Sequence, residues 1–166
     1  IIQTNPPQKS ERHVVLVAPE IHWNTGNIGR ACLGAGAHLH LIKPLGFSLA
    51  SREVKRAGLD YWHDVRLSVW EDFTEFQKET GIQKEEALVF TKNGEHAFWN
   101  IPHQLHRLFL IFGSETKGLP ESILSQFREN TYHIPICKTI RSLNLSTAVG
   151  IVLYESMRQS DSFHEY

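Results

Sequence analysis

The sequence predicts an α/β protein with a mostly parallel sheet and helices on both of its faces. Short β-branched, apolar runs alternate along the chain with segments of helical periodicity, and several of these runs end at proline or glycine. The run RLFLIFG (107–113) is almost entirely apolar, as expected of a strand buried on both faces of a parallel sheet. Ligands of such sheets bind beyond the carboxyl ends of the strands, so the loops after strands are where a site is expected.

Local patterns give the order of the elements. The β-branched run 13–20 is stopped by a proline, and small and apolar residues recur at helical spacing over 27–37. Pro120 is typical of the first turn of a helix. We expect strands at 13–20, 38–44, 64–70, 86–92, 107–113 and 130–136, and helices at 27–37, 51–62 (with a basic face), 71–81, 120–127 and, as the longest, 139–156.

Composition excludes several classes of protein. The 166 residues are 41% hydrophobic and 21% charged, which is ordinary for one soluble domain that buries roughly 70% of its unfolded surface. No apolar run reaches the length of about 18 residues that a membrane span needs. Cys32 and Cys137 lie far apart, which argues against a disulfide scaffold or zinc ribbon and favours a reducing, cytoplasmic location. A net charge of -1 gives no overall reason to expect nucleic acid, but leaves a local basic patch open.

We expect a single domain over residues 13–160. The polar segments 1–12 and 161–166 are predicted to be poorly ordered tails, and the first has no hydrophobic region of a signal peptide. No repeat, low-complexity linker or shift in composition marks a second domain.

Common catalytic and nucleotide-binding motifs are missing. The stretch GAGAHL (34–39) lacks the third glycine of a dinucleotide fingerprint and precedes a strand, which makes an ordinary nucleotide-binding α/β module a weak alternative. There is no P-loop spacing, no G-x-S-x-G and no H-E-x-x-H. His38 and His40 would share one face of a strand, and His103 and His106 lie about one turn apart. Either pair has metal-ligand spacing, but we expect surface histidines and no metal.

Three polar segments follow predicted strands. The first, NTGNIGR (24–30), has two glycines that permit close backbone approach, and it places Arg30 in the first turn of a helix. The second, FGSETKGLP (112–120), sets four polar residues between two glycines. The third, IPICKTIRSLNLSTAVG (134–150), offers Ser142, Asn144 and Ser146 as helix caps beside Arg141. Taken alone, each of the first two segments fits a plain turn as well as a binding site, and the third offers more polar side chains than one helix cap needs.

Together these segments resemble the three signature motifs of the SPOUT superfamily of RNA methyltransferases, in its SpoU branch. The first matches N-x-G-x-x-x-R, the second matches F-G-x-E-x-x-G-L-P, and the third resembles I-P-M-x-x-x-x-R-S-L-N-L-S-N-A-V, with Cys137 and Thr147 as departures. The stretches PEIHWNTGNIGR, KRAGLDYW and LVFTKNG resemble the short, single-domain members that methylate the ribose 2′-oxygen of the wobble nucleotide, cytidine or uridine 34, in tRNA. His22 and Trp23 replace the usual Pro-Pro before Asn24, which changes the stiffness of this segment or adds a base-stacking surface.

The resemblance implies a fold and a cofactor that periodicity does not. It implies a deep trefoil knot, a homodimer in which NTGNIGR of one subunit completes the site of the other, and S-adenosyl-L-methionine as the cofactor, released as S-adenosyl-L-homocysteine. The positions that match the family's cofactor site are Phe90, Thr91, Gly113, Glu115, Gly118, Ile134, Ile136, Ser142 and Leu143. In this site Gly113 would leave room for the ligand, and Glu115 and Asn144 would orient loops or substrate.

The resemblance also implies a metal-free reaction in which the ribose 2′-hydroxyl attacks the sulfonium methyl group in line. Arg30, Asn24, Ser142 and Asn144 match the catalytic positions. Because removing a proton from arginine at neutral pH costs on the order of 7 kcal/mol, Arg30 fits a cation that stabilises the developing alkoxide as well as it fits a base. Positive charge for tRNA phosphates would come from Lys43, Arg52, Lys55, Arg56, Lys117, Lys138 and Arg141. The alternatives are a noncatalytic, knotted RNA-binding or assembly protein and 2′-O-methylation at another tRNA or rRNA position.

Overall fold

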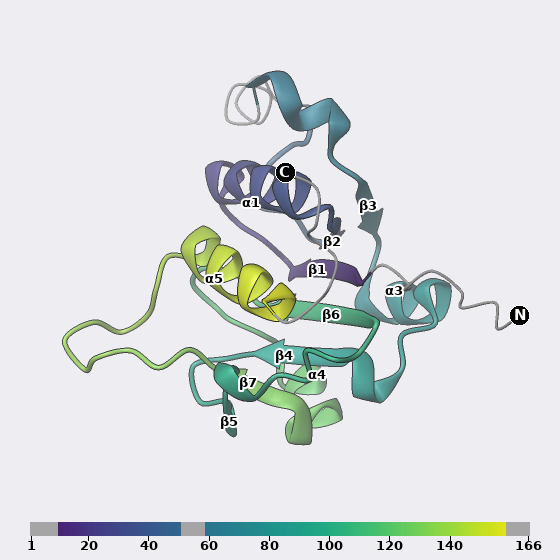
Figure 1. The fold of residues 1–166 in the computed structure, drawn as a ribbon. Coiled ribbons are helices and arrows are strands. Elements are labelled where there is room, and N and C mark those ends of the chain that lie inside the picture. Colours follow the sequence, from purple (N-terminus) through teal and green to yellow (C-terminus); the bar gives the residue numbers. More distant parts are fainter. Residues whose placement is uncertain (1–9, 51–58, 159–166) are drawn as a thin grey trace, which may run out of the picture.

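A parallel β-sheet forms the centre of the protein (Figure 1). The computed structural model describes residues 10–50 and 59–158, and within them seven strands pair in the order β3-β2-β1-β6-β4-β7-β5. Each of these pairings is parallel, which confirms the predicted α/β class with a mostly parallel sheet. The strands are β1 (Glu11–Val17), β2 (His38–Ile42), β3 (Leu67–Trp70), β4 (Ala87–Phe90), β5 (His96–Ala97), β6 (Arg107–Phe112) and β7 (Thr131–His133).

Helices cover both faces of the sheet. α1 and α5 lie side by side over one face, and α3 and α4 pack against the other (Figure 1). None of the helices in the described ranges has the length and apolar character to cross a membrane. The helices are α1 (His22–Ala35), α3 (Phe73–Thr80), α4 (Glu121–Gln126) and α5 (Leu145–Met157), with short 3₁₀ helices η1 (Leu59–Asp64), η2 (Lys84–Glu86), η3 (Phe98–Asn100) and η4 (Arg128–Asn130).

Side-chain alternation along the central strands produces one hydrophobic core under each layer of helices. In β1, Val14 and Leu16 face α1 and α5, whereas Val15 and Val17 face α3 and α4. Burying an aliphatic side chain of this size contributes about 1.5–3 kcal/mol, so the two cores together hold the sheet between its helices. The apolar run of the sequence is β6, which pairs with β1 on one side and β4 on the other. Its Leu108 and Leu110 lie in one core and its Phe109 and Ile111 in the other, so it is buried on both faces, as predicted.

The first strand begins earlier than its pattern predicts. β1 starts at Glu11, so Arg12 lies in the sheet although the sequence places it in the N-terminal tail. Arg12 is 3% exposed and donates hydrogen bonds to the Ser156 hydroxyl (3.2 Å) and carbonyl oxygen (2.9 Å) on α5, and burial lowers its pKa to about 10. These partners lie 144 residues away, which is why no local pattern indicates them. The rest of the predicted tails, 1–9 and 161–166, lies outside the described residues.

Several predictions about helices are wrong. The segment 24–30 was expected as a loop with Arg30 in the first turn of a helix, but it lies inside α1, which begins at His22. The closing helix begins at Leu145 and has 13 residues, so it is not the longest, because α1 has 14. Pro120 is the N-cap of α4 and precedes its first turn. Of the expected basic helix at 51–62, residues 51–58 lie outside the described residues and the remainder belongs to η1.

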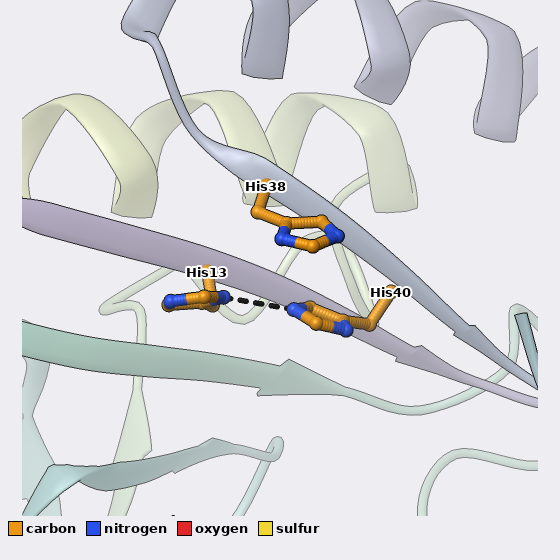
Figure 2. A group of neighbouring side chains, drawn as sticks. All are labelled: His13, His38 and His40. Atoms are coloured by element: carbon orange, nitrogen blue, oxygen red, sulfur yellow. Dashed lines mark hydrogen bonds between the residues drawn. The ribbon is translucent and has the colours of Figure 1, made fainter. Parts of the chain in front are cut away.

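Three histidines lie close together on neighbouring strands (Figure 2), on the face of the sheet that α3 covers. His13 of β1 lies beside His38 and His40 of β2, with ring centroids 5.0 Å apart for His13 and His40 and 4.1 Å apart for His38 and His40. His38 and His40 share one face, as predicted, because strand residues two apart point the same way. The expectation that they are surface residues is wrong: His38 is half-buried, and His40 is 1% exposed and packs against Phe76 of α3.

The hydrogen bonds of this histidine cluster fix its protonation. The Trp70 indole, which can only donate, bonds His40 Nδ1 at 3.0 Å, so the proton of a neutral His40 lies on Nε2. That Nε2 donates to His13 Nδ1 (2.8 Å), and His13 Nε2 donates to Glu11 Oε1 (2.5 Å). Ring nitrogens of the three histidines come within 4.8 Å of one another, a spacing that suits a metal. A metal on His40 Nε2 would displace the bond to His13 and would move the ring proton to Nδ1, where it would oppose the Trp70 N–H group, so the arrangement favours neutral, hydrogen-bonded rings.

We predict that the protein loses stability on acidification below about pH 6.5. Burial lowers the pKa of His13, that of His38 to about 4 and that of His40 to about 2, so the folded state keeps these rings neutral while the unfolded chain takes up protons. Because the unfolded state then binds more protons, the free energy of unfolding falls as pH falls, by up to about 1.4 kcal/mol per pH unit for a fully buried ring. Urea unfolding between about pH 7 and pH 5 measures the slope.

A variant can assign this slope to the cluster. His38→Gln can still bond the Ser68 hydroxyl, which His38 Nε2 contacts at 2.8 Å, but it removes one titrating ring, so its slope should be shallower than that of the wild type. His63→Gln, at an exposed ring on η1, is the matched control and should keep the full slope. Equal slopes in the two variants would contradict the assignment.

Candidate functional site

A cavity of about 1150 Å³ opens beyond the carboxyl ends of β4, β6 and β7. A parallel sheet places its ligand site here, because the loops that leave neighbouring strands converge at this edge. The loops after the three strands supply the walls, and Ile21 and Asn24 bring the N-terminus of α1 to the same space. All three polar segments of the sequence therefore reach one cavity.

The structure brings together most of the residues that the sequence assigns to a site. The nine predicted cofactor positions all line the cavity: Phe90, Thr91, Gly113, Glu115, Gly118, Ile134, Ile136, Ser142 and Leu143. Three of the predicted catalytic residues, Asn24, Ser142 and Asn144, and three of the predicted RNA contacts, Lys117, Lys138 and Arg141, line it too. The exceptions are Arg30, which lies elsewhere on α1, Lys43, which pairs with Glu71 at 2.7 Å, and Arg52, Lys55 and Arg56, which lie outside the described residues.

The carboxylate of Glu115 caps α1 from a distant loop. Ile21, at the N-cap, has no side-chain acceptor, and the first turn of the helix contains no acidic residue. Glu115 Oε2 accepts from the Glu20 N–H (2.7 Å), and its Oε1 accepts from the Ile21 N–H (3.0 Å) and from Asn24 Nδ2 (3.3 Å). A negative charge at a helix N-terminus satisfies free backbone donors and is favoured by the helix dipole. The second polar segment thus holds the first in place.

Asn24 and Asn144 join the first segment to the third. Asn24 is 2% exposed, and its Oδ1 accepts from Asn144 Nδ2 at 3.1 Å. Asn144 is also the N-cap of α5, where its Oδ1 accepts from the N–H groups of Ser146 (2.9 Å) and Thr147 (3.3 Å). Of the capping residues that the sequence offers, Asn144 is therefore the one whose side chain caps the helix. One chain of hydrogen bonds runs from Glu115 through Asn24 to Asn144.

Gly113 is required by the backbone of its own loop. It lines the cavity, but a Cβ atom on it would lie 2.2 Å from the carbonyl carbon of Gly118 and 2.4 Å from the nitrogen of Leu119. The space that a side chain would take is therefore filled by this loop, which closes through hydrogen bonds of 3.2 and 3.1 Å between the backbones of Ser114 and Gly118. The resemblance explained a glycine at position 113 by the room that a ligand needs. The tight turn from Ser114 to Gly118 is a second reason for a glycine there.

Backbone groups after β7 are available to a ligand. Ile134 and Ile136 line the cavity on either side of Pro135, and within the described part of the chain no backbone hydrogen bond is assigned to either isoleucine. Apolar side chains beside free amide groups can contact the faces of a flat aromatic ring while bonding its edge. This wall of the cavity therefore suits a purine.

Positive charge gathers around the cavity although the whole chain is close to neutral. Lys92, Lys117, Lys138 and Arg141 line it with exposed side chains, and the one carboxylate among the described lining residues, Glu115, is engaged at the helix cap. Lys92 is not among the cations predicted from the sequence. Its position two residues after β4 is the signal that could have identified it, since the loops after strands form the cavity.

Arg30 does not reach the cavity of its own chain. It lies on the exposed side of α1, and its guanidinium sits over the ring of Tyr61 in η1, 5.2 Å from the ring centroid. Because Arg30 lies inside the helix and not at its start, the helix carries it away from Asn24. The resemblance makes Arg30 the main catalytic residue, yet within one chain Arg30 is separated from the other predicted site residues.

The parallel sheet, the cavity at the strand ends and the three hydrogen-bonded segments define an α/β protein with a ligand site at the carboxyl edge of its sheet. The chain matches the SpoU rRNA Methylase family over residues 11–154, and it belongs to that family.

Relatives and solved structures agree with this assignment. A tRNA (cytidine(34)-2′-O)-methyltransferase of Burkholderia cenocepacia is 42% identical over 154 residues, which cover 89% of this chain and 95% of the relative. A solved structure concerned with the 2-OH methylation of C/U34 on tRNA is 40% identical, with a TM-score of 0.83, and covers 90% of this chain and 96% of that one. The methyltransferase AviRb of Streptomyces viridochromogenes, solved with AdoMet, shares the fold at a TM-score of 0.79 and 21% identity, over 93% of this chain and 62% of that one.

We predict that Asn144→Ala lowers the free energy of unfolding by about 1–2 kcal/mol, because it removes both the cap of α5 and the bond to Asn24. Asn144→Ser keeps a capping hydroxyl but is too short to reach Asn24, so it should cost less than the alanine variant. Urea unfolding of both variants measures the difference. Ser125→Ala on α4, whose hydroxyl bonds only carbonyl groups of its own helix, is the control. Equal losses for alanine and serine at 144 would contradict the role of this residue as a cap.

Proposed function

We propose that the protein transfers a methyl group from S-adenosyl-L-methionine to the ribose 2′-hydroxyl of nucleotide 34, cytidine or uridine, in the anticodon loop of tRNA. The observation that carries this proposal is the joining of all three family segments around one cavity by the bonds from Glu115 through Asn24 to Asn144. Further support comes from the Burkholderia relative, which is named for this reaction, and from the solved structure concerned with C/U34 methylation.

The residues of the cavity fit the proposed cofactor. Ile134, Ile136 and Leu143 offer apolar contacts for the adenine ring, and the free amide groups after β7 can bond its edge. Thr91 and Gly113, just beyond β4 and β6, complete the wall at the strand ends. When bound, S-adenosyl-L-methionine supplies an electrophilic methyl group and is converted to S-adenosyl-L-homocysteine. The bound AdoMet of the fold neighbour AviRb supports this choice.

In this proposal Arg30 acts on the ribose. As a cation it binds a phosphate next to the target nucleotide and stabilises the negative charge that develops on the 2′-oxygen as the hydroxyl attacks. The new O–C bond forms as the bond between the methyl carbon and the sulfonium sulfur breaks, and the hydroxyl proton passes to solvent water. Asn24 and Asn144 hold the N-termini of α1 and α5 against each other, so the segment that carries Ser142 stays in position at the cavity. The residues of the chain thus supply alignment and charge, which is what an in-line displacement needs.

The proposal includes a homodimer. Arg30 does not line the cavity of its own chain, so it can serve the reaction only if it reaches the cavity of a second copy. Leu33 on α1 and Ile151 and Tyr154 on α5 are 38%, 39% and 48% exposed, and the Tyr154 hydroxyl lies 3.2 Å from the position of a Cβ atom on Gly34. These residues give the adjoining surfaces of α1 and α5 an apolar character, which supports an interface between two copies.

The proposal also includes the trefoil knot. The segment after β7 lines the cavity over residues 134–145 and then continues as α5, which packs against α1, β1 and β6 in the middle of the sheet. A chain that leaves β7 near one edge of the sheet and returns across its centre supports a threaded C-terminus.

The exposed cations around the cavity, Lys92, Lys117, Lys138 and Arg141, are the proposed contacts for tRNA phosphates, together with Arg52, Lys55 and Arg56. We also propose a cytoplasmic location, which the tRNA substrate and the two free cysteines support. Burial raises the pKa of the Cys32 thiol to about 12, so that thiol is inert there.

Methyl transfer to unmodified tRNA, followed by mapping of the 2′-O-methylated nucleotide, tests the function. The expected product carries the methyl group at nucleotide 34. Ribose methylation elsewhere, with no product at 34, would contradict the target but not the reaction. Binding of S-adenosyl-L-methionine without any turnover would support the noncatalytic RNA-binding alternative.

We predict that Arg30→Ala reduces turnover at least about 100-fold, as expected when a cation that stabilises developing charge is removed. Because Arg30 does not line the cavity, the affinity for S-adenosyl-L-methionine, measured by calorimetry, should stay within about twofold of the wild type. Arg128→Ala, at an exposed arginine of η4, controls for the loss of one surface charge and should leave both quantities unchanged. Full turnover by Arg30→Ala would reject its role in the reaction.

A further inference from the structure

The Arg30 side chain of α1 lies over the aromatic ring of Tyr61 in η1. The guanidinium carbon lies 5.2 Å from the centre of the Tyr61 ring, within the range of about 6 Å for a cation–π interaction. Within the described residues, no hydrogen bond or ion pair is assigned to Arg30, although its side chain is exposed on α1. The face of an aromatic ring is thus the contact that the structure assigns to this guanidinium.

Tyr61 is held in place by its neighbour Trp62. A Cβ atom on Gly29 would lie 2.6 Å from Trp62 Cζ3 and 3.1 Å from Cε3, so the indole ring packs directly on the bare backbone of α1. Tyr61 and Trp62 are both partly buried against the core beneath α1 and α5. Gly29 precedes Arg30 in the sequence. Because it has no side chain, η1 packs closely against α1 there, and the Tyr61 ring therefore lies beside Arg30.

We propose that Tyr61 is a positioning residue, which holds the Arg30 guanidinium in one direction at the surface of α1. This inference rests on the function proposed above and concerns the role of Arg30 in it. Trp62 and Gly29 serve the same purpose indirectly, because they fix the helix that carries Tyr61.

The chemistry of the contact distinguishes the two roles open to Arg30. The negative face of an aromatic ring attracts a cation and has no such attraction for a neutral guanidine. A general base gives up its proton and with it this contact, whereas a group that binds phosphate and stabilises an alkoxide keeps both. The contact with Tyr61 therefore suits the electrostatic role of Arg30.

The contact also restricts the direction of a long side chain. A free arginine loses rotamer freedom when it binds a phosphate or a developing oxyanion, and this loss opposes binding. Tyr61 orders the side chain before the substrate arrives, which is how preorganised groups gain their advantage in catalysis.

Two variants of Tyr61 separate its ring from its other contacts. Tyr61→Leu removes the aromatic face, so kcat for methyl transfer should fall roughly two- to fivefold, the worth of a cation–π contact at an exposed site. Tyr61→Phe keeps the face and should restore kcat. The KM for S-adenosyl-L-methionine should stay the same in both variants, because neither Tyr61 nor Arg30 lines the cavity. Trp99→Leu, which removes an exposed ring on η3 away from the cavity, is the matched control and should leave kcat unchanged.

A readout that needs no turnover keeps this test separate from the test of the function. In ¹⁵N-arginine-labelled protein, the Nε–Hε resonance of Arg30, assigned by its loss in Arg30→Lys, should show the ring-current shift of Tyr61. That shift should vanish in Tyr61→Leu, remain in Tyr61→Phe and decrease in Gly29→Ala, where the new methyl group displaces Trp62.

The outcomes against the inference are distinct from those against the function. An Arg30 resonance that Tyr61→Leu leaves in place overturns the inference whether or not the protein methylates tRNA. Equal kcat values for Tyr61→Leu and the wild type, or equally low values for Tyr61→Leu and Tyr61→Phe, also overturn it. Absence of turnover in the wild type overturns the proposed function, and the resonance then still tests whether Tyr61 orders Arg30.

Discussion

The architecture of the site depends on one carboxylate, because α1 has no cap of its own. The side chain of Ile21 offers no acceptor to the first turn of the helix, and Glu115 accepts the backbone N–H groups of Glu20 and Ile21, just before that turn, from a loop 94 residues further along the chain. These partly buried donors would cost free energy if they lost their acceptor, so the helix start and the loop after β6 stabilise each other. Asn24 extends this dependence to Asn144 and thereby to α5. The cavity exists where these three segments are held together.

The same constraint explains which parts of the fold the sequence could predict. The order of strands and helices follows from local periodicity, and nearly all of it is confirmed. The start of α1 was missed because the signals of a helix start are a polar cap or an early acid, and both are supplied here by Glu115 from elsewhere in the chain. The place of Arg12 in β1 was missed for a similar reason, since its partner Ser156 is distant in sequence. Local patterns fail where the stabilising partner is remote.

The residues of the site could also be predicted only where their position does not depend on a remote partner. Residues after strands could be predicted as cavity residues, because a parallel sheet brings its carboxyl ends to one edge, and the family motifs named most of them. Periodicity alone did not decide whether these segments are turns and caps or parts of a binding site. Asn144 is both, because it caps α5 and lines the cavity. The position of Arg30 could not be predicted, because it depends on where α1 begins. Its contact with Tyr61 depends in turn on the fit of Trp62 against Gly29, a packing detail without a pattern of its own.

The start and the middle of α1 therefore have different partners and different tasks. Its N-terminus is tied through Glu115 and Asn144 to the segments that line the cavity, while Gly29 and Arg30, farther along the helix, are tied to η1 through Trp62 and Tyr61. Because a helix is rigid over a few turns, these two sets of contacts fix the positions of Asn24 and Arg30 relative to each other. Gly29, which the sequence offered as a feature of a turn, contributes to this by letting an indole ring pack against the helix backbone.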